Sequence, residues 1–429
     1  MFAHVDGNSF YASCEQVFDL DAARRPTVVL SNNDGCIVAA SKDAKELGCE
    51  MFKPYFQIKN VLSQHNTRVF SSNYTLYHDF QSRLVSIYRQ HSEAVEIYSI
   101  DEAFLKIADL GHDRLSQWAV ELRGTARQWT GITTGIGVGS SKLLAKLANH
   151  CAKRVALDGM REGVCVLDSP ERVDEALGRV DLKDLWGISR GSIRRLNKLG
   201  VQTPRQFRDA DPNLVRQELG VVGQRQVYEL RGKSCLPLEL IKPDRKNICC
   251  SRSFGKVTNR FDDLTEAIAT FCSAAAVKLR RQNLVASTVS VFVQTDRHAD
   301  VEQYANSRSM RLTTATEDTC ELIKAAKWCL SRVFRGQHHY KKAGVLLSNL
   351  GRREERQLGL YDQVDRTKTR GLMKTLDAIN DRHGRGSLRI GASSPFELRP
   401  CRTWHLRSDN RSPRYTTRWD ELPEATVSA

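Results

Sequence analysis

The first forty residues consist of short apolar runs separated by polar turns, a pattern typical of brief strands and helices. The elements that it predicts are a strand at Phe2–Val5, a helix at Phe10–Phe18, and strands at Thr27–Leu30 and Cys36–Ala40. The first strand ends on the polar residues 6–9. The pattern therefore places an acidic residue, Asp6, at a strand end.

The hydrophobic period then changes. Apolar residues recur at steps of four and three between Leu76 and Ile87, which predicts an amphipathic helix at about Tyr74–Gln90. Apolar segments on both sides of Asp101-Glu102 indicate that this acidic pair lies where two strands meet. The expected elements that follow are a helix at 115–129, a strand at 132–138 and a helix at 142–153. Such βαβ units combined with a hairpin predict an α+β core of the ferredoxin-like kind.

The second half of the chain predicts two further units. Short helices around the turns at 187–189 and 199–201 indicate a helical domain, in which Thr203-Pro204 has the cap-then-proline signal of a helix start. Residues 236–244 suit a linker. Beyond it we expect the order βαββαβ, with elements at 247–254, 264–282, 286–295, 309–312, 317–334 and 343–350. The remainder is arginine-rich and only partly periodic.

Composition narrows the class of protein. With 41% hydrophobic and 27% charged residues, dominant disorder is excluded. No run approaches the 18 apolar residues of a membrane helix, and Asp6 interrupts any signal peptide, so we expect no membrane partner. The 12 cysteines include no C-x-x-C pair, which favours reduced thiols in a cytoplasm and gives no support to a zinc site.

The charge is strongly basic and unevenly distributed. The net charge is 65 − 50 = +15, and residues 242–429 carry 34 − 21 = +13 of it. Such an excess favours a polyanionic partner such as nucleic acid, with the binding surface and the chemistry in different places. A role in solubility alone is the alternative.

The candidate chemistry centres on three carboxylates. The predicted hairpin brings Asp101 and Glu102 beside Asp6 in one sheet. Carboxylates held close together repel one another, and a divalent cation removes that repulsion, since Mg²⁺ prefers oxygen ligands and phosphate oxygens. Solvated acidic residues at strand ends are the alternative explanation at this point.

Several motifs carry a resemblance to a known family. Residues 6–12 (DGNSFYA) and 98–104 (YSIDEAF), near 95 residues apart, resemble the two palm motifs of the Y-family lesion-bypass DNA polymerases, and residues 135–148 (GIGVGSSKLLAKLA) resemble the third. Residues 31–36 (SNNDGC) and 412–419 (SPRYTTRW) resemble the UmuC-like subgroup, the catalytic subunits of bacterial DNA polymerase V. The DinB-type subgroup generally lacks this arginine-rich tail. The resemblance covers essentially the whole chain.

The resemblance implies roles for particular residues. Asp6, Asp101 and Glu102, with the Gly7 carbonyl, correspond to ligands of two Mg²⁺ ions. Tyr11 corresponds to the steric gate, the ring that excludes a ribose 2′-hydroxyl; a core aromatic is the alternative, and Phe10 is the next residue to examine. The residues that would hold the triphosphate are Lys42, Lys45 and Lys153. For these three, solvated surface lysines are the alternative. The expected DNA contacts are Lys142, Lys146, Arg245, Lys246 and Arg252.

Two further features concern binding. The turns at 187–189 and 199–201 resemble helix-hairpin-helix elements, which bind DNA phosphates through backbone N–H groups. Gln357, Leu358, Leu360 and Tyr361 resemble the short peptide that docks bacterial polymerases on the sliding clamp.

The sequence is thus interpreted as a right-hand polymerase of α+β class. The expected domains are a ferredoxin-like palm with small fingers (1–170), a helical thumb (171–235), a βαββαβ little finger (243–350) and a C-terminal partner-binding tail (351–429). The resemblance implies error-prone translesion synthesis by nucleotidyl transfer in the bacterial cytoplasm during SOS mutagenesis. The implied partners are damaged template-primer DNA, deoxynucleotide triphosphates, the UmuD′ dimer, the RecA filament and the sliding clamp. A DinB-type polymerase, a nucleotidyl cyclase and a non-catalytic DNA-binding scaffold are the alternatives.

Overall fold

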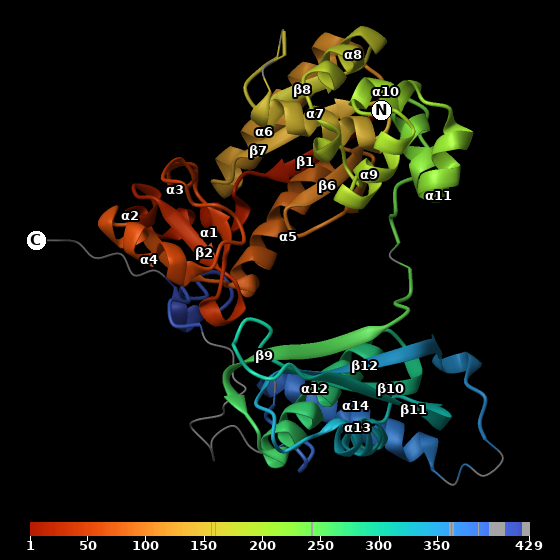
Figure 1. The fold of residues 1–429 in the computed structure, drawn as a ribbon. Helices are drawn as coiled ribbons and strands as arrows, with labels where there is room; N and C mark the ends of the chain where they lie inside the picture. Colours follow the sequence, from red (N-terminus) through yellow and green to blue (C-terminus); the bar gives the residue numbers. More distant parts are fainter. Residues whose placement is uncertain are drawn as a thin grey trace, which may run out of the picture. The chain divides into compact units, whose positions relative to one another are not determined.

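The computed structural model of the chain divides into two compact units (Figure 1). The first unit combines Met1–Lys242 with Asp409–Ala429, and the second is Pro243–Ser408. The structure describes residues 1–155, 157–158, 160–241, 243–359, 362, 364–384, 386–393 and 408–422.

A five-stranded sheet forms the centre of the first unit. Its order is β5 (Ala94–Ile97), β6 (Glu102–Lys106), β1 (Phe2–Gly7), β7 (Thr134–Gly139) and β8 (Val164–Leu167). The middle strand β1 is antiparallel to β6 and β7. This mixed sheet confirms the α+β class and the hairpin expected around Asp101-Glu102.

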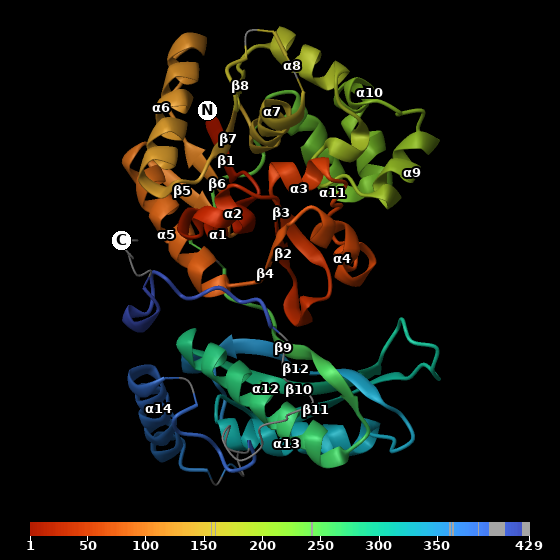
Figure 2. The same ribbon diagram turned by 90° about the vertical axis from the view of Figure 1, so that its left-hand side faces the viewer.

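Helices cover both faces of this sheet. Alternate side chains of β8 point in opposite directions: Val164 and Val166 join the core under α5 (Tyr74–Gln90) and α6 (His112–Thr130). Cys165 and Leu167 join the core under α7 (Lys142–Arg154). Figure 2 shows α6 and α7 on opposite sides of the sheet. Helix α5 has the bounds that its hydrophobic period predicted.

A second, smaller sheet in the first unit has the order β3 (Ile37–Ala40), β2 (Thr27–Leu30) and β4 (Arg68–Ser71). The helices around it are α1 (Phe10–Phe18), α2 (Leu20–Ala23), α3 (Lys42–Glu46) and α4 (Tyr55–Gln64). Strand β4 is parallel to β2 and occupies an edge. The hydrophobic pattern did not predict it, because only Val69 and Phe70 of its four residues are apolar.

Short helices complete the first unit. They are α8 (Pro170–Gly178), α9 (Arg190–Lys198), α10 (Pro204–Asp209) and α11 (Pro212–Leu230). The Thr203 side chain accepts a hydrogen bond from the Gln206 amide and Pro204 is the first helical residue, which confirms that helix start. The turn between α9 and α10 contains Gly200 at φ +74°, a left-handed conformation that suits glycine.

The second unit is a four-stranded antiparallel sheet with the order β11 (Ala305–Thr316), β10 (Leu284–Thr295), β12 (Tyr340–Arg352) and β9 (Ile248–Thr258). Helices α12 (Phe261–Arg281) and α13 (Thr319–Val333) pack on one face, which confirms the βαββαβ order. On the other face Thr288, Ser290 and Phe292 are half-exposed. Strand β11 is much longer than the four residues expected for it.

A helix that the sequence pattern did not predict follows the sheet. Helix α14 (Arg366–His383) lies against α12 through ion pairs of Arg280 with Asp377 (2.7 Å) and Arg281 with Asp381 (2.6 Å). Met373 is its one buried residue, so no apolar stripe marks it in the sequence. Residues from Asp409 onward group with the first unit instead.

Candidate active site

The three carboxylates lie together at one end of the five-stranded sheet. Asp6 is the register partner of Glu102 across β1 and β6. Asp101 directly precedes β6, and its carbonyl accepts a hydrogen bond from the Gly7 amide at 2.9 Å. The hairpin and the central strand therefore assemble residues that are near 95 positions apart in the sequence.

Two lysines of α7 neutralise these carboxylates. Lys153 Nζ lies 2.8 Å from Asp6 Oδ1, and Lys146 Nζ lies 3.2 Å from each carboxylate oxygen of Glu102. Burial raises the pKa of Asp6 and of Glu102, the lysines oppose that rise, and the neighbouring carboxylates reinforce it. Burial is the main cause of the raised pKa values, and the two ammonium groups offset it only in part.

Glycine allows one of these contacts. A Cβ added at Gly135 would lie 2.4 Å from Lys153 Cε and 3.1 Å from its Cγ. The stem of Lys153 therefore crosses β7 at a residue without a side chain to reach Asp6. This gives the first glycine of the 135–148 motif a physical role.

The donor set suits a hard divalent cation. Among the described residues, no three His, Cys, Asp or Glu side chains are grouped closely enough to hold a metal ion as they stand. Asp6 and Glu102 face lysines, and Asp101 accepts a hydrogen bond from the Ser99 hydroxyl at 2.5 Å. Carboxylate oxygens are the hard ligands that Mg²⁺ prefers, so the three side chains fit this ion once they turn from their present partners.

Tyr11 lies beside the carboxylates at the start of α1. Its ring stacks on that of Tyr77, with centroids 4.4 Å apart and an interplanar angle of 14°, and meets Tyr74 edge-on at 5.9 Å. Burial raises its pKa to about 12, so the ring is neutral at physiological pH. Phe10, by contrast, is only 3% exposed. The half-exposed ring at this end of the sheet is therefore Tyr11.

Phe10 also explains the glycine that precedes it. A Cβ at Gly7 would lie 2.9 Å from Phe10 Cδ2. The space that a side chain at position 7 would occupy is thus filled by the Phe10 ring. The absence of a side chain at residue 7 therefore leaves no empty space beside Phe10.

The three candidate triphosphate ligands separate in the structure. Lys153 lies on Asp6, and Lys45 Nζ donates to the Ser9 hydroxyl at 2.8 Å. Burial lowers the pKa of Lys45, and Lys153 and Arg154 lower it further. Lys42 is 89% exposed, with Glu46 at 4.0 Å as its partner. The structure brings Lys45 and Lys153 to the site and leaves Lys42 on the surface.

The expectation that Lys142 contacts DNA is wrong in this structure. Lys142 is 4% exposed, and its Nζ donates to Glu96 at 2.5 Å and to the Pro237 carbonyl at 2.8 Å. Glu96 in turn accepts from the Glu239 amide. A lysine in this position is a buried anchor for residues 237–239, because its charge is already satisfied within the protein.

Lys146 likewise belongs to the carboxylate cluster. Besides Glu102, its ammonium lies 4.5 Å from the ring centroid of Tyr98 and 5.2 Å from that of Trp186. Its side chain is only 16% exposed and its charge is used within the protein, so the structure gives its proposed contact with DNA no support.

Three residues of this region were missed by the sequence analysis. His4 lies two positions before Asp6 on the same face of β1, with Nε2 3.8 Å from Glu102 Oε1, and burial lowers its pKa well below the ordinary value. Glu15 and Tyr77 are fully buried and joined by a 2.6 Å hydrogen bond. The signal available for Glu15 was a charged residue one helical turn after Tyr11 on an apolar face.

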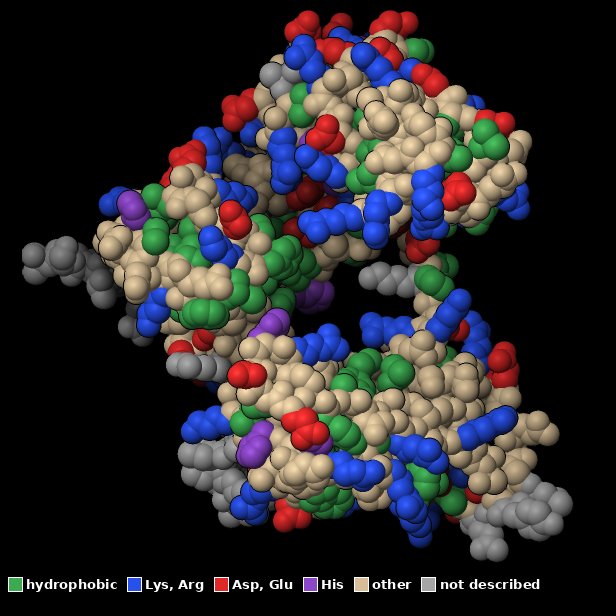
Figure 3. Space-filling model, in the orientation of Figure 1, with side chains coloured by type: hydrophobic (Ala, Val, Ile, Leu, Met, Phe, Trp, Pro, Cys, Tyr) green, Lys and Arg blue, Asp and Glu red, His purple; other side chains and the backbone are tan. Residues whose placement is uncertain are grey.

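The candidate binding residues of the second unit lie on its surface. Arg245, Lys246 and Arg252 are exposed, and Figure 3 shows Lys and Arg side chains along this unit. Gln357 and Leu358 of the clamp-like peptide are exposed too. Leu360 and Tyr361 lie outside the described residues.

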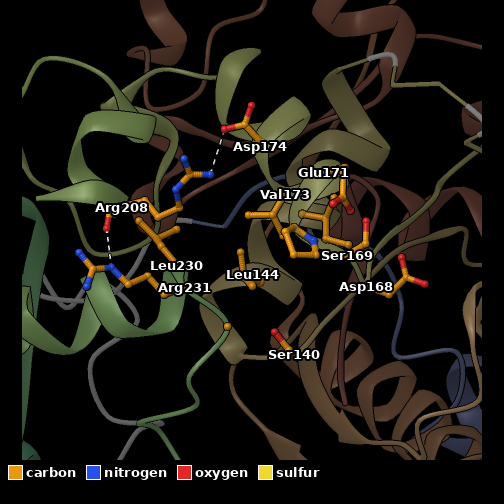
Figure 4. A pocket seen from close by; sticks show the side chains of 13 residues that line it. Ser140, Leu144, Asp168, Ser169, Glu171, Val173, Asp174, Arg208, Leu230 and Arg231 are labelled. Atoms are coloured by element: carbon orange, nitrogen blue, oxygen red, sulfur yellow. Dashed lines mark hydrogen bonds and ion pairs between the residues drawn. The ribbon is translucent and has the colours of Figure 1, made fainter.

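A groove of about 730 Å³ opens elsewhere in the first unit, next to α8 and α11 (Figure 4). Its charged residues are largely paired with protein groups: Arg208 with Asp174 at 3.0 Å, and Arg231 with the Arg208 carbonyl at 2.8 Å. None of the three carboxylates of the candidate site lines it. We therefore assign the chemistry to the sheet end.

Comparisons with known proteins identify the family of this chain. Residues 5–150 match the impB/mucB/samB family and residues 245–360 match its C-terminal domain, whereas residues 370–425 match a domain of unknown function. The chain is 38% identical over 425 residues to Protein UmuC of Salmonella typhimurium, covering 98% of this chain and 99% of that one. It is 37% identical to Protein MucB of Escherichia coli over the full length of both.

Less similar proteins support the fold. DNA polymerase IV of Bacillus velezensis is 24% identical, with 91% of this chain and 92% of that one covered, which disfavours the DinB-type alternative. A solved Y-family chimera of the polymerases Dbh and Dpo4 superposes with a TM-score of 0.65 at 20% identity, covering 82% of this chain and 99% of that one. Among the described residues, no helix is both long and apolar enough to cross a membrane. The chain therefore belongs to the impB/mucB/samB family, is similar over its length to UmuC, and has the fold of the Y-family DNA polymerases.

Proposed function

We propose that this DNA-directed DNA polymerase inserts deoxynucleotides opposite damaged template bases, as an error-prone translesion enzyme of the bacterial SOS response. The observation that carries the proposal is the placement of Asp6, Asp101 and Glu102 at one sheet end in a chain similar over its full length to UmuC. A nucleotidyl cyclase would use such carboxylates too, but it has no need of the basic second unit.

The reaction would be attack of a primer 3′-hydroxyl on the α-phosphate of a bound deoxynucleotide. Asp6, Asp101, Glu102 and the Gly7 carbonyl are the groups that would hold two Mg²⁺ ions, whose positive charge stabilises the attacking oxygen and the leaving pyrophosphate. Lys45 and Lys153 would hold the triphosphate as point charges. Lys153, which now contacts Asp6, would exchange this partner for a phosphate oxygen when the nucleotide binds.

Sugar selection falls to Tyr11. Its ring is backed by Tyr77 and flanked by Tyr74, so it does not retreat freely from a ligand beside the carboxylates. A ribose 2′-hydroxyl would meet the ring face, and exclusion would come from steric overlap.

DNA would be held chiefly by the second unit and by the hairpins around α9. The exposed basic residues near β9 suit contacts with backbone phosphates, which confer affinity without reading bases. We further propose the palm and fingers, thumb, little finger and tail boundaries given above, and the UmuD′ dimer, the RecA filament and the sliding clamp as partners in a bacterial cytoplasm.

Primer extension on a template with one abasic site tests the proposal. We expect the purified chain to extend past the lesion in Mg²⁺, with stimulation by UmuD′ and RecA, and to stop when EDTA is added. An undamaged template serves as the matched control. Extension that halts at the lesion with every partner present, while the undamaged template is copied, would refute translesion synthesis but leave polymerase activity standing.

A further inference from the structure

The described part of the C-terminal segment, residues 409–422, is built into the first unit. Ser71 at the end of β4 donates its amide to the Asn410 carbonyl at 2.9 Å, and Asn410 donates its own amide to the Ser71 hydroxyl at 3.0 Å. Arg411 pairs with Ser71 in a parallel bridge. The segment therefore extends the edge of the small sheet, and Figure 2 shows it running beside β4.

One buried amide fastens this segment. The Asn73 side chain donates to the Ser412 hydroxyl at 2.9 Å, to the Ser412 carbonyl at 3.2 Å and to the Pro413 carbonyl at 3.1 Å. Asn73 and Ser412 are both buried. Three residues further along, the Tyr415 ring stacks on Phe18 of α1 with centroids 4.8 Å apart. This contact is packed like a core rather than laid on a surface.

Asn73 is also the cap of α5. Its side-chain oxygen accepts from the Leu76 amide at 3.4 Å, and its carbonyl accepts from the Tyr77 amide at 3.1 Å. The first turn of α5 carries Tyr74 and Tyr77, the two rings that contact Tyr11. The residue that holds the C-terminal segment thus also fixes the helix turn behind Tyr11.

A second connection passes through Glu15. The Tyr77 hydroxyl donates to Glu15 at 2.6 Å, and the hydroxyls of Tyr77 and Ser412 are the side-chain groups that stabilise the Glu15 carboxylate. Tyr77 and Glu15 are both fully buried. Glu15 Oε2 is buried and has no hydrogen-bond partner among the described residues, so loss of the nearby Ser412 hydroxyl would leave this carboxyl more dependent on Tyr77.

We propose that Asp409–Tyr415 is a positioning element for the Tyr11 ring, acting through Ser412, Asn73, Glu15 and Tyr77. The proposal rests on the gate role given to Tyr11 above. It assigns a task to part of a region whose family model has no known function. The Tyr11 ring excludes ribonucleotides only if it cannot move away from the 2′-hydroxyl. Tyr77 stacks on this ring, and the C-terminal segment helps to hold Tyr77 in place.

Single-nucleotide insertion kinetics test the proposal on the full-length chain. The ratio of kcat/KM for a deoxynucleotide to that for its ribonucleotide is measured for the parent, Ser412→Ala, Asn73→Asp and Tyr77→Phe. Asn73→Asp keeps the helix cap but removes the donors to the C-terminal segment. We expect the ratio to fall by about tenfold in each variant through faster ribonucleotide insertion. Trp419→Ala, a change at a 91% exposed residue of the same segment, is the control and should keep the parental ratio.

The same changes in a Tyr11→Ala background identify the route. The proposal requires that Ser412→Ala have no further effect on the ratio when Tyr11 is already alanine. In the protein with native Tyr11, Ser412→Thr keeps the hydroxyl and should retain the parental ratio. An equal effect in both backgrounds would overturn it.

If Tyr11→Ala loses discrimination and the C-terminal variants keep it, the positioning role is wrong and the gate stands. If Tyr11→Ala keeps discrimination, both are wrong. Thermal unfolding of each variant shows that the fold is intact, and Ser412→Ala carries the test if Asn73→Asp unfolds.

Discussion

At the scale of single residues, the site is a balance between carboxylates and lysines. Asp6 and Glu102 each have an ammonium partner, whereas Asp101 has a hydroxyl. Nucleotide binding would disturb the Lys153–Asp6 ion pair, because Lys153 would then be drawn to the triphosphate. Asp101 is the carboxylate that can be altered without freeing a lysine.

Asp101→Asn is therefore the cleanest test of the metal assignment. The change keeps the shape and removes the charge, so we expect single-turnover extension to fall by about a thousandfold, in line with several kcal/mol of lost charge stabilisation. Duplex affinity measured by fluorescence anisotropy should stay at the parental value. Asp109→Asn removes an exposed carboxylate beyond β6 and is the control. Near-parental extension by Asp101→Asn would remove this residue from the ligand set.

Glu15 gives a prediction on pH. Burial raises its pKa from 4.5 to about 7, against the hydrogen bonds from Tyr77 and Ser412. The folded state therefore binds the proton more tightly than the unfolded state. Its contribution to stability is complete below pH 4.5 and is lost as pH rises to 7, a difference of 7 − 4.5 = 2.5 units or about 3 kcal/mol.

Glu15→Gln removes this titration and keeps an acceptor for the Tyr77 hydroxyl. We expect the variant to gain stability relative to the parent between pH 5 and pH 8, measured as the shift in urea unfolding of the first unit followed by tryptophan fluorescence. Effects of other groups cancel in the comparison of the two proteins. If the difference in unfolding free energy between parent and variant is the same at pH 5 and pH 8, Glu15 has an ordinary pKa in the folded protein.

At the scale of elements, the sequence predicted those helices and strands whose own residues carry a clear hydrophobic pattern. Helix α5 was predictable because it is long enough to show its repeat, and the strands on either side of Asp101 were predictable because they are mostly apolar. Strand β4 and the 410–415 segment were not predictable, because only two residues of β4 are apolar and the segment is held by backbone and side-chain hydrogen bonds. Helix α14 escaped because it buries little, and Lys142 was misread because a lysine's burial depends on Glu96, far away in sequence.

The corrected position of Lys142 has a measurable consequence. It ties α7 to β5 and to residues 237–239, so Lys142→Ala leaves Glu96 buried without its partner and should destabilise the first unit by about 3–5 kcal/mol. DNA affinity should keep its salt dependence. Lys183→Ala, which removes a surface lysine, is the control for stability. A parental unfolding curve together with a shallower salt dependence would return Lys142 to the DNA interface.

At the scale of the whole molecule, charge and chemistry are separated. The first unit assembles the carboxylates, while +13 of the net +15 lies in residues 242–429. The open face and edge of the second unit's sheet carry exposed basic residues, and α14 carries others on the helical side. Net charge alone does not show which of these two sides binds DNA. The number of phosphates that each side contacts does show it, and the salt dependence of affinity measures that number.

Replacing Arg245, Lys246 and Arg252 with serine should flatten the slope of log affinity against log salt by up to about three, because each phosphate contact releases about one counterion. The matched variant replaces Lys368, Arg370 and Lys374, three exposed basic residues of α14, and removes the same charge from the same unit. If contact decides affinity, the slope changes only in the first variant. An equal flattening of the slope in the two variants would mean that DNA affinity depends on the overall charge of this unit. The basic residues near β9 would then make no specific phosphate contacts.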